Sequence, residues 1–104
     1  MITINTQEEF NSFIKENTLA MIDFYAEWCG PCKRVGPELQ TMSETMTNIS
    51  FAKVDIDKVP ELAESFRIRS IPTMIMFKSG GENQRIVGAP PSMQIKEKLV
   101  EFSK

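Results

Sequence analysis

The chain has 104 residues, a formal net charge of −2, two cysteines and no histidine. A chain of this length buries a core without disulfide staples, so we expect residues 1–104 to form a single domain, and we expect it to be a monomer. The weak negative charge gives no reason to expect nucleic acid as a partner. The sequence has no apolar run of about 18 residues and no basic-then-apolar leader, so we expect no membrane span or signal peptide.

Apolar residues alternate or run continuously where strands are expected and recur every three or four residues where helices are expected. The predicted strands are 2–4, 19–26, 49–56, 74–77 and 85–87. The predicted helices are 6–16, 33–46 continuing from the cysteines, 60–66 and a last one beginning near Ser92. This order, βαβαβαββα, predicts an α/β sandwich in which helices cover a mixed sheet.

Local signals support these elements. Thr6 with Glu9 three residues later is a capping-box pattern that begins the first helix. Residues 19–26 are almost continuously apolar, which is typical of a strand covered on both faces. Gly80-Gly81 predicts a hairpin turn, and Ser92 is the predicted cap of the last helix, with Met93 and Val100 among its core residues.

The two cysteines, Cys29 and Cys32, lie where the second strand pattern gives way to the second helical pattern. Unpaired N–H groups and the helix dipole favour a thiolate at a helix start, so we expect Cys29 to be the nucleophile. Residues three apart share one helix face, which lets Cys32 close onto Cys29 as a disulfide. Pro31 suits a first helical turn, and Gly30 leaves the approach to the sulfurs open.

Other uses of the cysteine pair fit the sequence poorly. A disulfide closing so short a loop contributes little chain-entropy stabilisation, so a structural staple is a weak explanation. A zinc site needs further Cys or His ligands, and haem attachment needs a histidine where the chain has Lys33. Redox exchange remains, and two cysteines without a leader point to a reducing, cytoplasmic compartment.

A carboxylate inside the predicted central strand is a second candidate for function. Asp23 lies between Ile22 and Phe24, where burial raises the pKa of a carboxyl group. Two interpretations are open: a hydrogen-bonded structural aspartate, or a proton acceptor for the second thiol. Lys53 in the next strand is likewise either a solvated surface charge or the charge partner of Asp23.

The segment from Asp23 to Cys32, which reads DFYAEWCGPC, resembles the active-site block of the thioredoxin family. Residues 55–57, 69–73 and 87–89 match further family motifs in the same order, so the resemblance covers nearly the whole chain. It implies the thioredoxin fold and the activity of a protein-disulfide reductase that needs no bound cofactor. Tyr25, where many members have tryptophan, and Ser70, where glycine is common, depart from the family pattern.

The resemblance also implies roles for individual residues. Cys29 is expected to attack a target disulfide and Cys32 to resolve the mixed disulfide, while Asp23 accepts the proton of Cys32 and Lys53 is the neighbouring cation. The bond before Pro72 is expected to be cis. The expected substrate-binding surface comprises Trp28, Gly30, Pro31, Ile71, Pro72, Gly88 and Ala89.

The implied partners are a thioredoxin reductase that supplies electrons from NADPH and proteins that contain disulfides. Ribonucleotide reductase, peroxiredoxins and methionine sulfoxide reductases are the target classes implied by the resemblance. Two alternatives stay open: a binding or scaffold subunit in which the cysteines are incidental, and an oxidant or isomerase of the same superfamily. By the resemblance, the Gly-Pro pair between the cysteines favours reduction, since oxidising members of the superfamily usually carry a histidine there.

Overall fold

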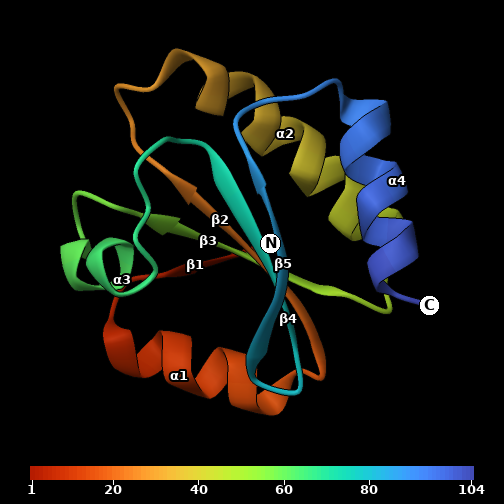
Figure 1. The fold of residues 1–104 in the computed structure, drawn as a ribbon, viewed down its shortest axis with the longest axis horizontal. Coiled ribbons are helices and arrows are strands. Elements are labelled where there is room, and N and C mark those ends of the chain that lie inside the picture. Colours follow the sequence, from red (N-terminus) through yellow and green to blue (C-terminus); the bar gives the residue numbers. More distant parts are fainter.

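The computed structural model describes residues 1–104, and its elements follow the order βαβαβαββα (Figure 1). The strands are β1 (Ile2–Ile4), β2 (Leu19–Tyr25), β3 (Ser50–Asp55), β4 (Thr73–Lys78) and β5 (Gly81–Val87). The helices are α1 (Gln7–Glu16), α2 (Gly30–Thr45), α3 (Pro60–Ser65) and α4 (Ser92–Phe102). The predicted element order is confirmed.

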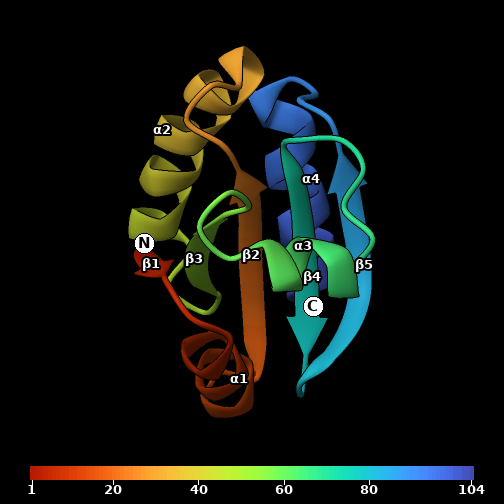
Figure 2. The same ribbon diagram turned by 90° about the vertical axis from the view of Figure 1, so that its left-hand side faces the viewer.

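The strands form one five-stranded mixed sheet in the order β1-β3-β2-β4-β5. The strands β1, β3 and β2 are parallel, whereas β4 is antiparallel to both β2 and β5. The continuous apolar run of β2 therefore lies at the centre of the sheet, as its sequence predicts. Figure 2 shows the five strands side by side, with α3 in front of the sheet and α4 behind it.

Alternate side chains of each strand face opposite sides of the sheet, so each face has its own core. One core lies under α1 and α3 and includes Ile22, Phe24 and Phe77. The other lies under α2 and α4 and includes Met21 and the β4 methionines at 74 and 76. In this alternation, the odd-numbered residues of β2 face α2, which places the side chain of residue 23 on the same side as the cysteines.

The first helix begins as the sequence predicts, with one difference in its capping bonds. Thr6 is the N-cap, and its Oγ1 accepts a hydrogen bond from the N–H of Glu9 at 3.0 Å. The Glu9 carboxylate accepts from the N–H of Asn5 at 2.7 Å, one residue before the position expected in a capping box. Both bonds satisfy backbone donors around the start of α1.

The hairpin and the last helix differ from the sequence predictions in detail. Ser79 and Gly80, both with positive φ, make the turn, and Gly81 is already the first residue of β5. This pair of left-handed residues matches the twist of the flanking strands better than the predicted Gly80-Gly81 turn. Strand β5 is consequently longer than the predicted 85–87.

The predicted cap of the last helix was wrong. Pro91 is the N-cap of α4, without a side-chain capping bond, and Ser92 is the first helical residue. Met93 and Val100 were predicted to be core residues but are exposed, with 68% and 42% of their surface accessible. The buried face of α4 is formed instead by Ile95, Leu99 and Phe102, which pack in the core under this helix.

Candidate functional site

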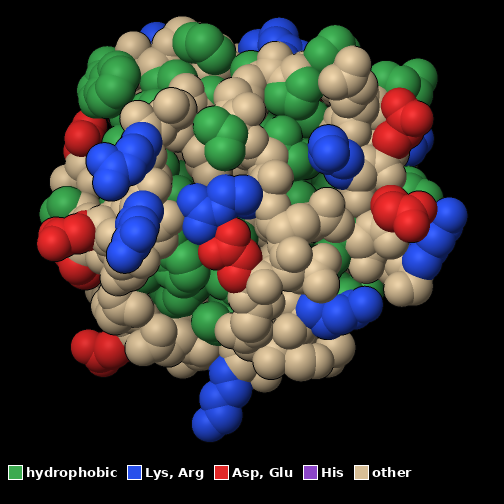
Figure 3. All heavy atoms as spheres, viewed as in Figure 1, with side chains coloured by type: hydrophobic (Ala, Val, Ile, Leu, Met, Phe, Trp, Pro, Cys, Tyr) green, Lys and Arg blue, Asp and Glu red, His purple; other side chains and the backbone are tan.

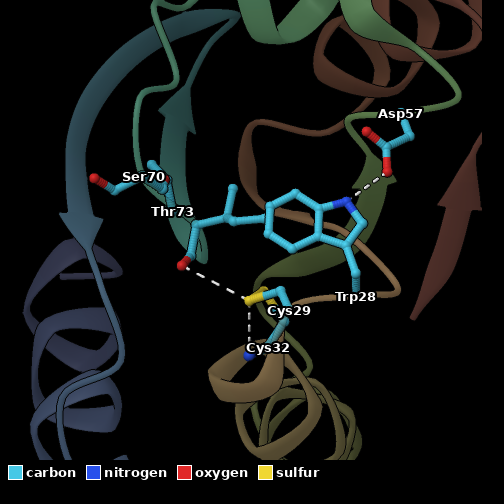
Figure 4. Close-up of a disulfide and its surroundings, with 7 residues drawn as sticks. Trp28, Cys29, Cys32, Asp57, Ser70 and Thr73 are labelled. Atoms are coloured by element: carbon cyan, nitrogen blue, oxygen red, sulfur yellow. Dashed lines mark hydrogen bonds between the residues drawn. A yellow bond between two sulfur atoms is a disulfide. The ribbon is translucent and has the colours of Figure 1, made fainter.

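The two cysteines lie at the start of α2, directly after the carboxyl end of β2. Cys29 is the N-cap of the helix, and its Sγ accepts a hydrogen bond from the N–H of Cys32 at 3.2 Å. Pro31 occupies the first turn, where a helix tolerates proline because the N–H groups there have no partner within the helix. The Cα atoms of Cys29 and Cys32 are 5.3 Å apart and their sulfurs form a disulfide, as the spacing predicts (Figure 4).

The two sulfurs have different neighbours. Cys29 Sγ lies 3.8 Å from the carbonyl oxygen of Ile71 (Figure 4). In the disulfide this is a contact, because the sulfur has no proton to donate until the pair is reduced. Cys32 instead lines an open pocket of about 520 Å³ together with Asp23 and Lys53. The geometry thus places Cys29 beside a backbone carbonyl of another loop, and Cys32 in a pocket that Asp23 and Lys53 also line.

The Asp23 carboxyl group is buried without a partner for one of its oxygens. The residue is only 1% exposed, and Oδ1 has no hydrogen-bond partner. Burial raises the pKa of Asp23 to about 7, and the positive charge of Lys53 offsets part of that rise. A buried carboxyl group that titrates near neutrality in a pocket with a cysteine can exchange protons at physiological pH.

The structure brings Lys53 alongside Asp23 without a salt bridge between them. The two residues are directly paired in the parallel register of β2 and β3, so their side chains lie on the same face of the sheet. The Lys53 ammonium lies 5.5 Å from the ring centroid of Tyr25, within cation–π distance. Lys53 therefore acts on the Asp23 charge through space, while Tyr25 contacts its ammonium.

The Trp28 indole is held by Asp57, a residue for which the sequence predicted no such role. The indole Nε1–H donates to Asp57 Oδ2 at 2.8 Å (Figure 4), and the side chain is 69% exposed. The Asp57 N–H in turn donates to the carboxylate of buried Asp55 at 2.9 Å. The only available signal was the family motif at residues 55–57, which does not reveal the contact with Trp28.

One further loop contacts Cys29, and a second loop is hydrogen-bonded to the first. The Ile71–Pro72 peptide bond is cis, as the resemblance implied, and it places the Ile71 carbonyl against Cys29. The Pro72 carbonyl accepts a hydrogen bond from the N–H of Gly88 at 2.8 Å. Gly88 has φ +92°, a left-handed conformation that favours glycine. The segment after β5 is thereby fixed to the segment before β4.

The predicted surface residues therefore lie at one end of the sheet. Trp28, Gly30 and Pro31 are exposed, Ile71, Gly88 and Ala89 are half-buried, and Pro72 is buried. Figure 3 shows hydrophobic side chains along the upper edge of the molecule, where α2 begins in Figure 1. An apolar rim around a disulfide whose two cysteines are only 4% and 5% exposed suits contact with an extended segment of another protein.

The family model described as Thioredoxin matches residues 1–101 of the chain. Thioredoxin 1 of Plasmodium falciparum (isolate 3D7) is 44% identical over 89 residues, which cover 86% of this chain and 86% of that protein. The chain belongs to the thioredoxin family. The thioredoxin of Chlamydia caviae is 46% identical over 88 residues, covering 85% of each chain. A solved structure of Plasmodium falciparum thioredoxin is 38% identical and superposes with a TM-score of 0.94, covering 98% of this chain and 99% of that one.

Membership of the thioredoxin family identifies the activity. The chain is a thiol-disulfide oxidoreductase, a protein-disulfide reductase whose redox-active dithiol is the Cys-Gly-Pro-Cys pair. Members of the thioredoxin family typically bind no cofactor. None of the helices of this family member combines the length and the hydropathy that a membrane span requires.

Proposed function

We propose that Cys29 is the attacking thiolate and Cys32 the resolving thiol of this reductase. In the first step the Cys29 thiolate attacks one sulfur of a target disulfide, forming a mixed disulfide and releasing one target thiolate. The N-cap position supports this order, because the N–H of Cys32 and the helix dipole both favour negative charge on Cys29 Sγ.

In the second step Cys32 loses its proton and attacks Cys29 Sγ. The mixed disulfide breaks, the second target thiolate leaves, and the cysteine pair becomes the disulfide, so that the target gains the two electrons that the pair loses. We assign the proton acceptor to Asp23, which shares a pocket with Cys32 and has its pKa raised to about 7 by burial. Lys53 moderates that pKa as the neighbouring cation.

The target segment docks on the apolar rim around Cys29. We assign this docking surface to Trp28, Gly30, Pro31, Ile71, Pro72, Gly88 and Ala89. Support comes from the contact between Cys29 and Ile71, from the exposed indole of Trp28, and from the hydrogen bond between Pro72 and Gly88. An extended substrate would form backbone hydrogen bonds beside Ile71, as strand-addition complexes do.

The electron source in this proposal is an NADPH-dependent thioredoxin reductase, with no cofactor bound to the chain itself. The proposed targets are proteins with accessible disulfides, among them ribonucleotide reductase, methionine sulfoxide reductases and peroxiredoxins. One similar solved chain, with 30% identity and a TM-score of 0.90, comes from work on how a yeast mitochondrial 1-Cys peroxiredoxin is resolved through glutathione and thioredoxin systems. We place this protein in a reducing, cytoplasmic compartment, since its only cysteines are the redox pair. We also propose that it is a monomer and that residues 1–104 form one domain.

The proposal rests on the different surroundings of the two sulfurs. Trapping the mixed disulfide between this protein and a target tests the order in which the two cysteines react. With insulin as the target, thioredoxin reductase and NADPH, the unmodified protein should reduce the insulin disulfides catalytically. Cys32→Ser should instead accumulate a covalent complex through Cys29, and Cys29→Ser should accumulate none. A complex formed equally by both variants would overturn the order of attack.

Asp23→Asn separates the two steps. The variant should slow the release of reduced target while leaving the first attack close to normal, because only the second step needs a proton removed from Cys32. Equal slowing of both steps would contradict the role of Asp23 as proton acceptor.

A further inference from the structure

Arg34 forms an unusual set of hydrogen bonds near the cysteine pair. It lies in α2 two residues after Cys32, and its Nη2 donates to the carbonyl oxygens of Ala89 and Pro90, each at 2.8 Å. Its Nη1 donates to both carboxylate oxygens of Glu38, at 2.9 and 3.1 Å. One guanidinium therefore joins the catalytic helix to the segment between β5 and α4, which passes beside the beginning of α2 in Figure 1.

The segment from Gly88 to Pro91 depends on such outside partners. It belongs to neither β5 nor α4, and its two prolines have no N–H to donate. Its first residue is fixed by the hydrogen bond from Gly88 N–H to the Pro72 carbonyl. The carbonyls of Ala89 and Pro90 are then fixed by Arg34, so three consecutive residues of the segment have hydrogen bonds to other parts of the chain.

Together these contacts link the three segments near Cys29 to one another. Cys29 contacts the Ile71 carbonyl, and the neighbouring Pro72 carbonyl accepts a hydrogen bond from Gly88. The Ala89 carbonyl, next to Gly88, accepts from Arg34 of α2, the helix that begins directly after Cys29. Arg34 supplies the hydrogen bond between α2 and the Ala89 carbonyl, in addition to the packing of the Ala89 side chain against the core under α2 and α4.

Glu38 orients the guanidinium in this arrangement. The pair is spaced i,i+4 on the helix, with side chains 43% and 30% exposed, and such surface ion pairs add little stability. Their geometry matters more, because Nη1 is held by both oxygens of the Glu38 carboxylate while Nη2 donates to the two carbonyls. An isolated surface salt bridge would not explain the two short bonds to the loop.

We propose that Arg34 is a positioning residue that holds the Ala89–Pro90 backbone in place for docking and thereby sets the affinity for protein disulfides. This inference rests on the docking surface assigned above. Arg34 contacts neither sulfur, so its effect is confined to partners large enough to reach Ala89. Small disulfides react with Cys29 without that contact.

The test compares two disulfides of different size in Arg34→Met, which keeps a long side chain but cannot donate. KM for insulin reduction, measured with the reductase in excess, should rise about threefold to tenfold, as expected for losing charge-assisted bonds that order a binding segment. The rate at which the reduced variant reacts with 5,5′-dithiobis(2-nitrobenzoic acid) should stay within about twofold. Arg34→Lys, which can reach only part of the bonding set, should give an intermediate KM.

Lys96→Met is the matched control, because it removes the same charge from an exposed position on α4 that has no ion pair or hydrogen bond. Its KM for insulin should equal that of the unmodified protein. An Arg34→Met variant that matches this control, or one whose two reactions slow by the same factor, would overturn the inference. If Arg34→Met unfolds, the comparison of Arg34→Lys with Lys96→Met decides the question in the same way.

Ala89→Asp separates this inference from the proposed function. A charge introduced at the docking surface should raise KM for insulin. If it does so while Arg34→Met does not, the docking surface stands and the positioning role of Arg34 fails. If neither variant changes KM, the docking surface itself is wrong.

Discussion

Replacing Asp23 with asparagine should stabilise the protein, although it removes a residue assigned to the reaction. The carboxyl group is 1% exposed, and burial raises its pKa from 3.8 to about 7. A rise of roughly three pKa units means that the ionised form costs the folded state about 4 kcal/mol relative to the unfolded state. Asparagine has a similar shape and no charge, so it avoids that cost.

The sign of the effect gives its pH dependence. Because the folded-state pKa is raised, the folded protein binds the Asp23 proton more tightly than the unfolded chain does. Stability linked to this group is present below the unfolded pKa near 3.8 and is lost as the pH rises to about 7. The advantage of Asp23→Asn should therefore grow between these pH values and remain constant above pH 7.

Urea unfolding of the oxidised protein, followed by far-UV circular dichroism, measures this advantage at pH 5 and pH 8.5. We expect the difference in unfolding free energy between the variant and the parent to be about 2 to 3 kcal/mol larger at the higher pH, from the two pKa values. Glu97→Gln, which removes one exposed carboxylate, is the control for net charge. The same difference at both pH values, or a less stable Asp23→Asn at pH 8.5, would refute the reasoning.

Two further substitutions test the surroundings of the cysteines. Asp57→Ala removes the hydrogen-bond acceptor of the Trp28 indole. The fluorescence anisotropy of this single tryptophan should therefore fall, and KM for insulin should rise. Asp57→Asn keeps an acceptor oxygen and should change both quantities less. Unchanged anisotropy in Asp57→Ala would mean that the bond does not hold the ring. Gly88→Ala should lower the free energy of unfolding, measured in urea, by about 1 to 3 kcal/mol, because Gly88 has a positive φ. A steric clash is not the cause, since a Cβ at this position meets no atom within 4 Å. Gly36→Ala, a helical glycine whose Cβ is equally unobstructed, should instead gain up to about 1 kcal/mol, and equal effects at the two sites would contradict the backbone explanation.

The sequence predicted the fold well because its strongest signals are local. The continuous apolar run of β2 and the helical spacing of α1 and α2 each specify an element and its buried face. The errors occurred at boundaries and in the buried face of the last helix, where Met93 and Val100 are exposed. The hairpin turn uses Ser79 in a left-handed conformation that glycine would be expected to occupy, and α4 begins one residue earlier than a Ser92 cap would require.

The chemistry of the site was predictable only in part. The spacing of Cys29 and Cys32 predicted their disulfide, and the position of Asp23 in a central strand predicted its burial. The contacts that distinguish the two sulfurs join residues far apart in the chain, such as Cys29 with Ile71. Trp28 with Asp57, and Arg34 with Ala89, are likewise long-range contacts that no local pattern reveals.

The most direct test of the central claim is the alkylation of the reduced protein by iodoacetamide across a pH series, with the modified residue identified by peptide mass spectrometry. We expect Cys29 to be labelled first, with a midpoint below the value of about 8.5 for a free cysteine, because the start of α2 stabilises its thiolate. Cys32 should remain unlabelled until much higher pH. Equal labelling of the two cysteines, or faster labelling of Cys32, would contradict the account.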